Sequence, residues 1–109
     1  MKMNNKVQLI GNLGMNPEIK QLDNNKTLAK FSIATNDIYK NNKGEKMIDT
    51  TWHTIIAWGN TALIAEKILE KGCNVAIEGK LINRSYEDKD GIKRFVTEVL
   101  ATEILKLNK

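Results

Sequence analysis

The sequence predicts an all-β domain that contains a single helix. Two stretches, 7–13 and 75–81, alternate apolar and polar residues with the two-residue period of a strand. A third stretch, 51–58, is rich in the β-branched and aromatic residues that favour strands. Helical spacing of apolar residues occurs only over 61–71. With 109 residues, of which 41% are hydrophobic and 28% charged, the chain is expected to form one globular domain over 1–109.

The first strand is expected over 7–13, where every second residue is apolar or glycine. Gly14 and Pro17 end this strand, because both residue types interrupt regular structure. The glycines of this region are expected to let the strand bend as a barrel closes. A short extended piece follows over 18–22, and the polar segment 23–25 turns the chain.

A hairpin of two long strands comes next. Its first strand covers 28–38 and places Phe31 and Ile33 on one face. The polar loop 41–46 leads into its second strand, which contains 51–58.

The single helix is expected over 61–71. Gly59 ends the preceding strand, and Asn60 is of a residue type that caps helix N-termini. Gly72 fits the left-handed conformation that often ends a helix. The apolar side of this helix is predicted to consist of Ile64, Ala65, Ile68 and Leu69.

Two more strands complete the chain, over 75–81 and 95–104, with a charged turn at 87–91 between them. The predicted order is therefore three strands, a helix, and two strands. Five strands with a helix between the third and the fourth form an OB-fold, a partly open Greek-key barrel. A generic α+β sheet domain is the alternative that this order leaves open.

The two tryptophans of the chain stand six residues apart, at Trp52 and Trp58. An even separation on a strand puts both indoles on the same face, with Thr54 and Ile56 between them. Such a row can belong to the core, where tryptophan is common, or to a surface platform for flat partners. The strand alone does not decide between these two interpretations.

Charge and aromatic residues favour an anionic partner. The net charge is +4 and the pI about 9.2, and Arg84 and Arg94 are the only arginines among 17 basic residues. Lysine suits phosphate as a point charge, whereas the arginine fork suits bidentate reading of bases. Tyr39 and Tyr86 are both flanked by basic residues, an arrangement that single-strand binders use. These tyrosines can equally be amphipathic residues at hairpin ends.

Catalytic and metal-binding patterns are not found. No serine or cysteine lies in a nucleophile elbow, and 11–14 lacks the residues of a phosphate loop. Cys73 is interpreted as a packing residue, and His53, opposite the indoles, as a buried hydrogen-bonded side chain. One histidine and one cysteine do not make a zinc site, and no cofactor is expected. Residues 1–6 lack a signal sequence and no apolar run spans a membrane, so we expect a cytoplasmic protein.

The chain resembles the bacterial single-stranded DNA-binding protein family in several short stretches, which occur in the same order as in that family. Those stretches are Asn5-Lys6-Val7, Gly11-Asn12-Leu13-Gly14, Pro17-Glu18, Phe31-Ser32-Ile33-Ala34-Thr35, Trp52-His53, Ala57-Trp58-Gly59, Lys71-Gly72, Ile77-Glu78-Gly79-Lys80-Leu81, Gly91, Arg94-Phe95 and Glu98-Val99. They extend from about residue 5 to residue 105 at the spacings of the family.

This resemblance implies an OB-fold, usually a homotetramer, that binds single-stranded DNA without catalysis in replication, recombination and repair. The expected stacking residues are Trp52, Trp58, Tyr39 and Tyr86. The expected phosphate contacts are Lys6, Lys40, Lys43, Lys71, Lys80 and Arg84. His53 matches the histidine that the family has next to a subunit contact.

The chain departs from the family in two respects. Four positions that are often basic in the family are not basic here: Thr54, Asn60, Ile82 and Ser85. The sequence also stops at Asn108-Lys109 and does not include the flexible acidic tail through which the family recruits replication and repair proteins. Either the protein is naturally tailless or a longer one was cut. Two rival functions are a primosomal-type OB adaptor that acts through protein partners, and a small OB enzyme or anticodon-binding module.

Overall fold

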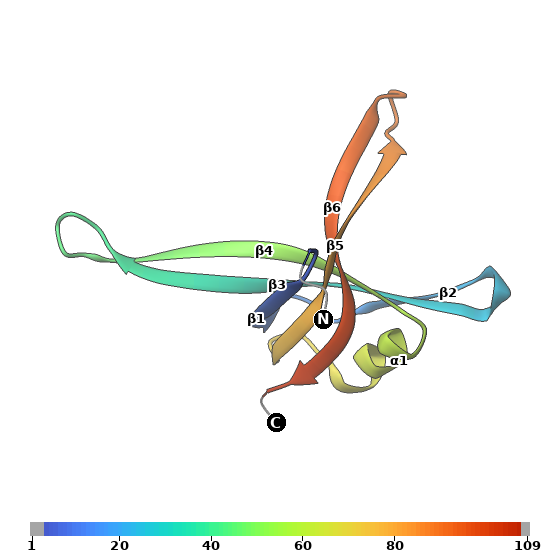
Figure 1. Ribbon diagram of the computed structural model, residues 1–109, viewed down its shortest axis with the longest axis horizontal. Coiled ribbons are helices and arrows are strands. Elements are labelled where there is room, and N and C mark those ends of the chain that lie inside the picture. The colour runs from blue at the N-terminus through green and yellow to red at the C-terminus, as the bar shows by residue number, and fades with distance from the viewer. Residues whose placement is uncertain (1–3, 108–109) are drawn as a thin grey trace.

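The structure is a computed structural model that describes residues 4–107 as six strands and one α-helix (Figure 1). The elements are β1 (Val7–Leu13), β2 (Glu18–Leu22), the 3₁₀ turn η1 (Asp23–Asn25), β3 (Lys26–Lys40), β4 (Lys46–Trp58), α1 (Gly59–Ile68), β5 (Asn74–Glu87) and β6 (Lys93–Lys106). Asn108 and Lys109, on which the expectation about the tail rests, lie outside the described residues.

The strands form one sheet in the order β1-β5-β6-β4-β3-β2, and a pairing of β1 with β3 closes it into a barrel. β1 and β2 lie end to end along β3, with Leu13 opposite Ile33 and Glu18 opposite Lys30. They are therefore two parts of one interrupted strand. Counted in this way, the barrel has five strands with the helix between the third and the fourth. The predicted OB-fold is confirmed.

The helix differs from the prediction at both ends. It begins at Gly59, directly after β4, and no side chain caps it, so the expected cap by Asn60 is wrong. It ends at Ile68, because the next residue, Leu69, is extended, with φ −99° and ψ 141°. Gly72 does have a positive φ of 89°, but within a turn that follows the helix. The predicted apolar side is also partly wrong, since Ile64 is 46% exposed.

The core fills the inside of the barrel and the space under α1. Alternation along β3 and β4 buries Phe31, Ile33 and Ile55 completely or nearly so. Ala62 and Ala65 are the buried residues of α1 in this core, and Ile68 packs against it. The barrel curves tightly where Gly11 passes the carbonyl oxygen of Ala34, a position at which any Cβ would collide with that oxygen.

Two long hairpins extend away from the barrel, as Figure 1 shows. We call residues 36–50 the β3–β4 arm and residues 83–97 the β5–β6 arm. All residues of the β3–β4 arm except Asn41 are exposed. The surfaces of these arms are therefore available to partners, and their strands pair without the support of a core of their own.

Candidate nucleic-acid interface

Both tryptophans lie on the outer surface of the barrel. Trp52 is 60% and Trp58 42% exposed, whereas Ile55 and Ala57, which alternate with them, are fully buried. The core interpretation of the two indoles is therefore wrong, and the predicted shared face of β4 is confirmed. Ile56, which lies between them on that face, is 6% exposed and covered by neighbouring strands.

The indole of Trp52 packs on a glycine. A Cβ built on Gly14 would lie 2.5 Å from Cζ3 and 2.8 Å from Cη2 of the Trp52 ring, closer than side chains approach one another. Gly14 sits directly after β1, and its amide donates to the carbonyl oxygen of Ser32 at 3.1 Å. Gly14, the first residue between β1 and β2, has no side chain and thus leaves room for the ring of Trp52.

An open groove of about 620 Å³ lies beside the indole row. Lys30 and Thr54 line it from β3 and β4, and Arg84, Tyr86 and Glu98 line it from β5 and β6. It joins the surface that carries the tryptophans to the β5–β6 arm. Tyr86, 46% exposed, is thereby brought next to the row that contains Trp52 and Trp58.

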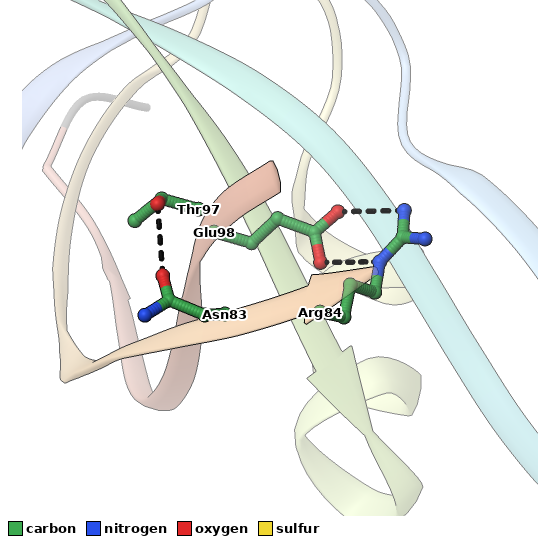
Figure 2. A network of polar contacts seen from close by, with 4 residues as sticks. All are labelled: Asn83, Arg84, Thr97 and Glu98. Atoms are coloured by element: carbon green, nitrogen blue, oxygen red, sulfur yellow. Dashed lines mark hydrogen bonds and ion pairs between the residues drawn. The ribbon is translucent and has the colours of Figure 1, made fainter. Parts of the chain in front are cut away.

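A buried carboxylate fixes Arg84 in this groove (Figure 2). Nε of Arg84 donates to Oε1 of Glu98 at 2.8 Å, and its Nη2 donates to Oε2 at 3.1 Å. The hydrogen bond to Glu98 raises the pKa of Arg84 above its ordinary value. Beside this pair, the hydroxyl of Thr97 donates to Oδ1 of Asn83 at 2.8 Å.

The two side chains of this ion pair are buried to different extents. The side chain of Glu98 is 4% exposed and that of Arg84 49% exposed. Of the five N–H groups of a guanidinium, three remain free of Glu98. Arg84 can therefore hold Glu98 and still present donors to a ligand in the groove.

The predicted lysine contacts lie in different places. Lys40 and Lys43 belong to the β3–β4 arm, and Lys80 follows the bulge of β5 on the face that also carries Arg84. Lys71 lies in the turn after α1. Lys6 lies just before β1, where its Nζ is 3.3 Å from Oε1 of Glu78, and sequence reasoning did not foresee that pairing.

Strand alternation places Tyr39 on the face of the β3–β4 hairpin opposite to that of the tryptophans. The pairing of β3 with β4 is unbroken, with Ala34 opposite Trp52 and Tyr39 opposite Met47. The odd separation of Ala34 and Tyr39 places the Tyr39 side chain, 45% exposed, on the other face of the arm.

His53 lies on the predicted side of β4, opposite the indoles. It is half-buried, its register partner on β3 is the buried Ile33, and its Nε2 lies 3.0 Å from Oγ1 of Thr35.

Cys73 is a buried free thiol, as expected of a packing residue. Among residues 4–107, no group of three or more His, Cys, Asp or Glu side chains could hold a metal ion. Over the same residues, no helix is long and apolar enough to cross a membrane.

Two charged residues of the groove were missed by sequence analysis. Lys30 lies opposite Ile56 on the face of the indoles, and Glu98 is the buried partner of Arg84. The alternation of 28–38 could have placed Lys30 on the face opposite Phe31 and Ile33. Glu98 gave no such signal, because its position follows from how β5 pairs with β6.

A barrel of five strands and one helix, with an aromatic row beside a basic groove, defines an OB-fold module of the kind that binds oligonucleotides. The sequence model of the single-strand binding protein family matches residues 4–107. The chain belongs to this family, and the resemblance noted from its motifs is confirmed.

Curated relatives carry the same family name. The chain is 40% identical over 106 residues to single-stranded DNA-binding protein 1 of Xylella fastidiosa, covering 96% of this chain and 78% of that protein. It is 40% identical over 104 residues to single-stranded DNA-binding protein 1 of Chlorobaculum tepidum, covering 94% of this chain and 64% of the relative. The chain thus spans 78% and 64% of the length of these two relatives.

Solved structures agree with this assignment. The Plasmodium falciparum SSB, in a complex with ssDNA, superposes with a TM-score of 0.89 at 31% identity, over 99% of this chain and 98% of that one. A deletion mutant of the single-stranded DNA binding protein from Thermus aquaticus gives a TM-score of 0.82 at 28% identity, over 95% and 50% of the two chains.

Proposed function

We propose that this protein binds and protects single-stranded DNA, with little sequence preference and without catalysis, in replication, recombination and repair. The observation that carries the proposal is the pair of exposed indoles, Trp52 and Trp58, in one row beside a groove with basic residues. Exposed aromatic rings with cations nearby suit unpaired bases, because every base has a π face and every nucleotide a phosphate. Membership of the family supports the same conclusion.

In the proposed mechanism, bases stack on the rings and phosphates follow the cations. Trp52, Trp58 and Tyr86 supply rings along the barrel and the groove. Tyr39 adds a ring on the other face of its arm, where a strand that wraps around the hairpin would meet it. Phosphates are contacted by Lys30, Lys40, Lys43, Lys71, Lys80 and the free donors of Arg84. Lys6 contributes only when it leaves Glu78.

The proposed assembly is a homotetramer in the cytoplasm, associated with the nucleoid. The outer face of β1, β5 and β6 supports a contact between copies, because Ile10 and Leu105 are 63% and 61% exposed there. They border a hollow of about 440 Å³ that Ala76 also lines. Apolar side chains of this size are more stable in an interface than in water. His53, half-buried on β4, is proposed to lie next to a subunit contact.

The test is a fluorescence titration with an oligonucleotide of mixed sequence. We expect strong quenching of tryptophan emission and a negative slope of log K against log salt, because lysine–phosphate contacts release counterions. Trp52→Ala and Trp58→Ala should each weaken binding by about 1–3 kcal/mol, the usual worth of one base on an aromatic ring in single-strand-binding OB folds. Both variants should stay folded.

The rival functions give different results in the same titration. A primosomal-type adaptor would leave the emission of both tryptophans nearly unchanged on addition of DNA. An OB enzyme or anticodon-binding module would prefer one sequence or structure strongly over oligo(dT). Either outcome, or a flat response to salt, would contradict the proposed function.

A further inference from the structure

The row of side chains that carries Trp52 continues beyond the barrel onto the β3–β4 arm. Because β3 and β4 pair without a bulge from Leu28–Trp58 to Lys40–Lys46, alternation keeps every second pair on the same face. Beyond the pair Ala34–Trp52, the pairs on this face are Asn36–Thr50, Ile38–Ile48 and Lys40–Lys46. The first of these is fixed by a 2.7 Å hydrogen bond from the hydroxyl of Thr50 to Oδ1 of Asn36.

Ile38 and Ile48 form an exposed apolar pair. They lie directly opposite each other and are 61% and 59% exposed, about as much as Trp52. They are not part of the barrel core, because the arm lies outside it (Figure 1). Although the two side chains cover each other in part, most of their apolar surface still faces water, and a partner that covers it is stabilised by the hydrophobic effect.

The charges of the arm indicate what covers them. Lys40 and Lys46 are opposite each other on the face of the isoleucines, and between residues 4 and 107 neither has an ion-pair partner. Like charges at opposite positions repel each other, and an anion between them removes that repulsion. On the other face, Asp37 lies opposite Asp49, so the two faces of the arm carry opposite charge.

We propose that the Ile38–Ile48 pair and the Lys40–Lys46 pair form one further nucleotide-binding site for single-stranded DNA. This inference rests on the proposed function. A phosphate lies between the two ammonium groups, and the base lies on the two isoleucines. Aliphatic side chains offer no π face, so the site gains most from a base that adds apolar surface of its own. Thymine does so through its 5-methyl group, and the site therefore favours thymine.

A second copy of this chain fits the surface less well. An arm that packed on the isoleucines through its own corresponding face would add a second cationic pair to the same interface. The continuity of this surface with the indole row also places it on the path of a strand that stacks on Trp52. Single-stranded DNA satisfies both the apolar and the cationic part of the site.

The experiment compares oligo(dT) with oligo(dU) of equal length, both as deoxyribose strands, because they differ only in the 5-methyl group. For the unaltered protein we expect tighter binding of oligo(dT), by about fourfold for each methyl group that the isoleucines cover. The double variant Ile38→Thr/Ile48→Thr should lose most of this ratio. Threonine keeps the β-branched shape that suits a strand, so the arm stays paired. Ile38→Val/Ile48→Val, which keeps an aliphatic surface, should retain the preference.

Met47→Ser is the matched control, since Met47 is an exposed apolar residue on the other face of the arm. It should leave the ratio of the two affinities unchanged. Lys46→Gln should weaken binding of both oligonucleotides equally and make the salt slope shallower by about one unit.

Three results would overturn the proposal. One is an unchanged ratio in the threonine variant, and another is an equal loss of the ratio in Met47→Ser. The third is a lower molar mass by light scattering for the threonine variant with unchanged DNA binding, which would make a second copy the occupant. If the unaltered protein failed to bind either oligonucleotide, the proposed function itself would be wrong instead.

Discussion

Gly14→Ala tests whether the position of one indole matters for binding. The backbone of Gly14 is not in the left-handed region, so alanine fits the chain there, but its Cβ would lie 2.5 Å from Cζ3 of Trp52. Ordinary contact begins at 3.4 Å, so the ring has to retreat by about 0.9 Å. Because Trp52 is 60% exposed, the ring can move into solvent without opening the core.

The size of the effect follows from this displacement. A gap of about 0.5–1 Å removes roughly a quarter to a half of a van der Waals contact. Applied to a stacked base worth about 1–3 kcal/mol, this predicts a loss of roughly 0.3–1.5 kcal/mol, or about two- to twelvefold in affinity. The free energy of unfolding should change by less than about 1 kcal/mol, since alanine also restricts the unfolded chain.

The assay is a titration with oligo(dT) by fluorescence anisotropy of a labelled strand, together with urea denaturation. A double-mutant cycle supplies the control: in the background of Trp52→Ala, Gly14→Ala should cost nothing further. Wild-type affinity for Gly14→Ala, or the same loss in both backgrounds, would refute the argument that Gly14 acts by seating the Trp52 ring.

Three further predictions concern polar contacts. Arg84→Met should destabilise the fold by about 1–3 kcal/mol in urea denaturation, because it leaves the buried carboxylate of Glu98 without its two donors; adding Glu98→Met should restore stability. His53→Leu should lower oligomer stability by about 1–3 kcal/mol, with dissociation on dilution measured by light scattering and DNA binding retained at high protein concentration. The hydrogen bond from Arg94 lowers the pKa of Asp88 in the folded protein. The ionised carboxylate therefore stabilises the fold at a pH above the pKa of Asp88 in the unfolded chain, and this stability is lost as the pH falls through the pKa of Asp88 in the folded protein. The stability difference between wild type and Arg94→Met, followed by thermal melting, should therefore shrink in acid; a difference independent of pH would contradict this.

The elements of the barrel could be predicted because their signals are local, whereas the choice of an OB-fold over a generic α+β domain rested on the family resemblance. Alternation, turn residues and one helical period define every main element, and the interrupted first strand was visible in the break at Gly14 and Pro17. The prediction for the helix ends was less accurate. Asn60 has the chemistry of a cap, but β4 passes directly into the helix at Gly59, and packing against the barrel determines where the helix begins.

The candidate site was predicted where it depends on a single strand. That the side chains of Trp52 and Trp58 lie on one face follows from the alternation of side chains along β4 alone. The ion pair of Arg84 with Glu98, by contrast, depends on the pairing of β5 with β6, which shifts at a bulge between Glu78 and Gly79. A shift of this kind changes which residues face each other, and it leaves no mark in the composition of either strand.

The barrel has two seams, and they set how it opens. β1 is joined to β3 through only two residue pairs, Asn12–Ala34 and Leu13–Ile33, and β4 is joined to β6 through only two more, Ile55–Val99 and Ile56–Leu100. Between the seams, the strands are joined by long ladders into two leaves, β1-β5-β6 and β2-β3-β4. Few backbone hydrogen bonds therefore join the two leaves, and buried side chains make most of the contact between them. Amide protons at the seams should exchange with deuterium before those in the middle of either leaf, and a ligand that lies across both leaves should slow that exchange.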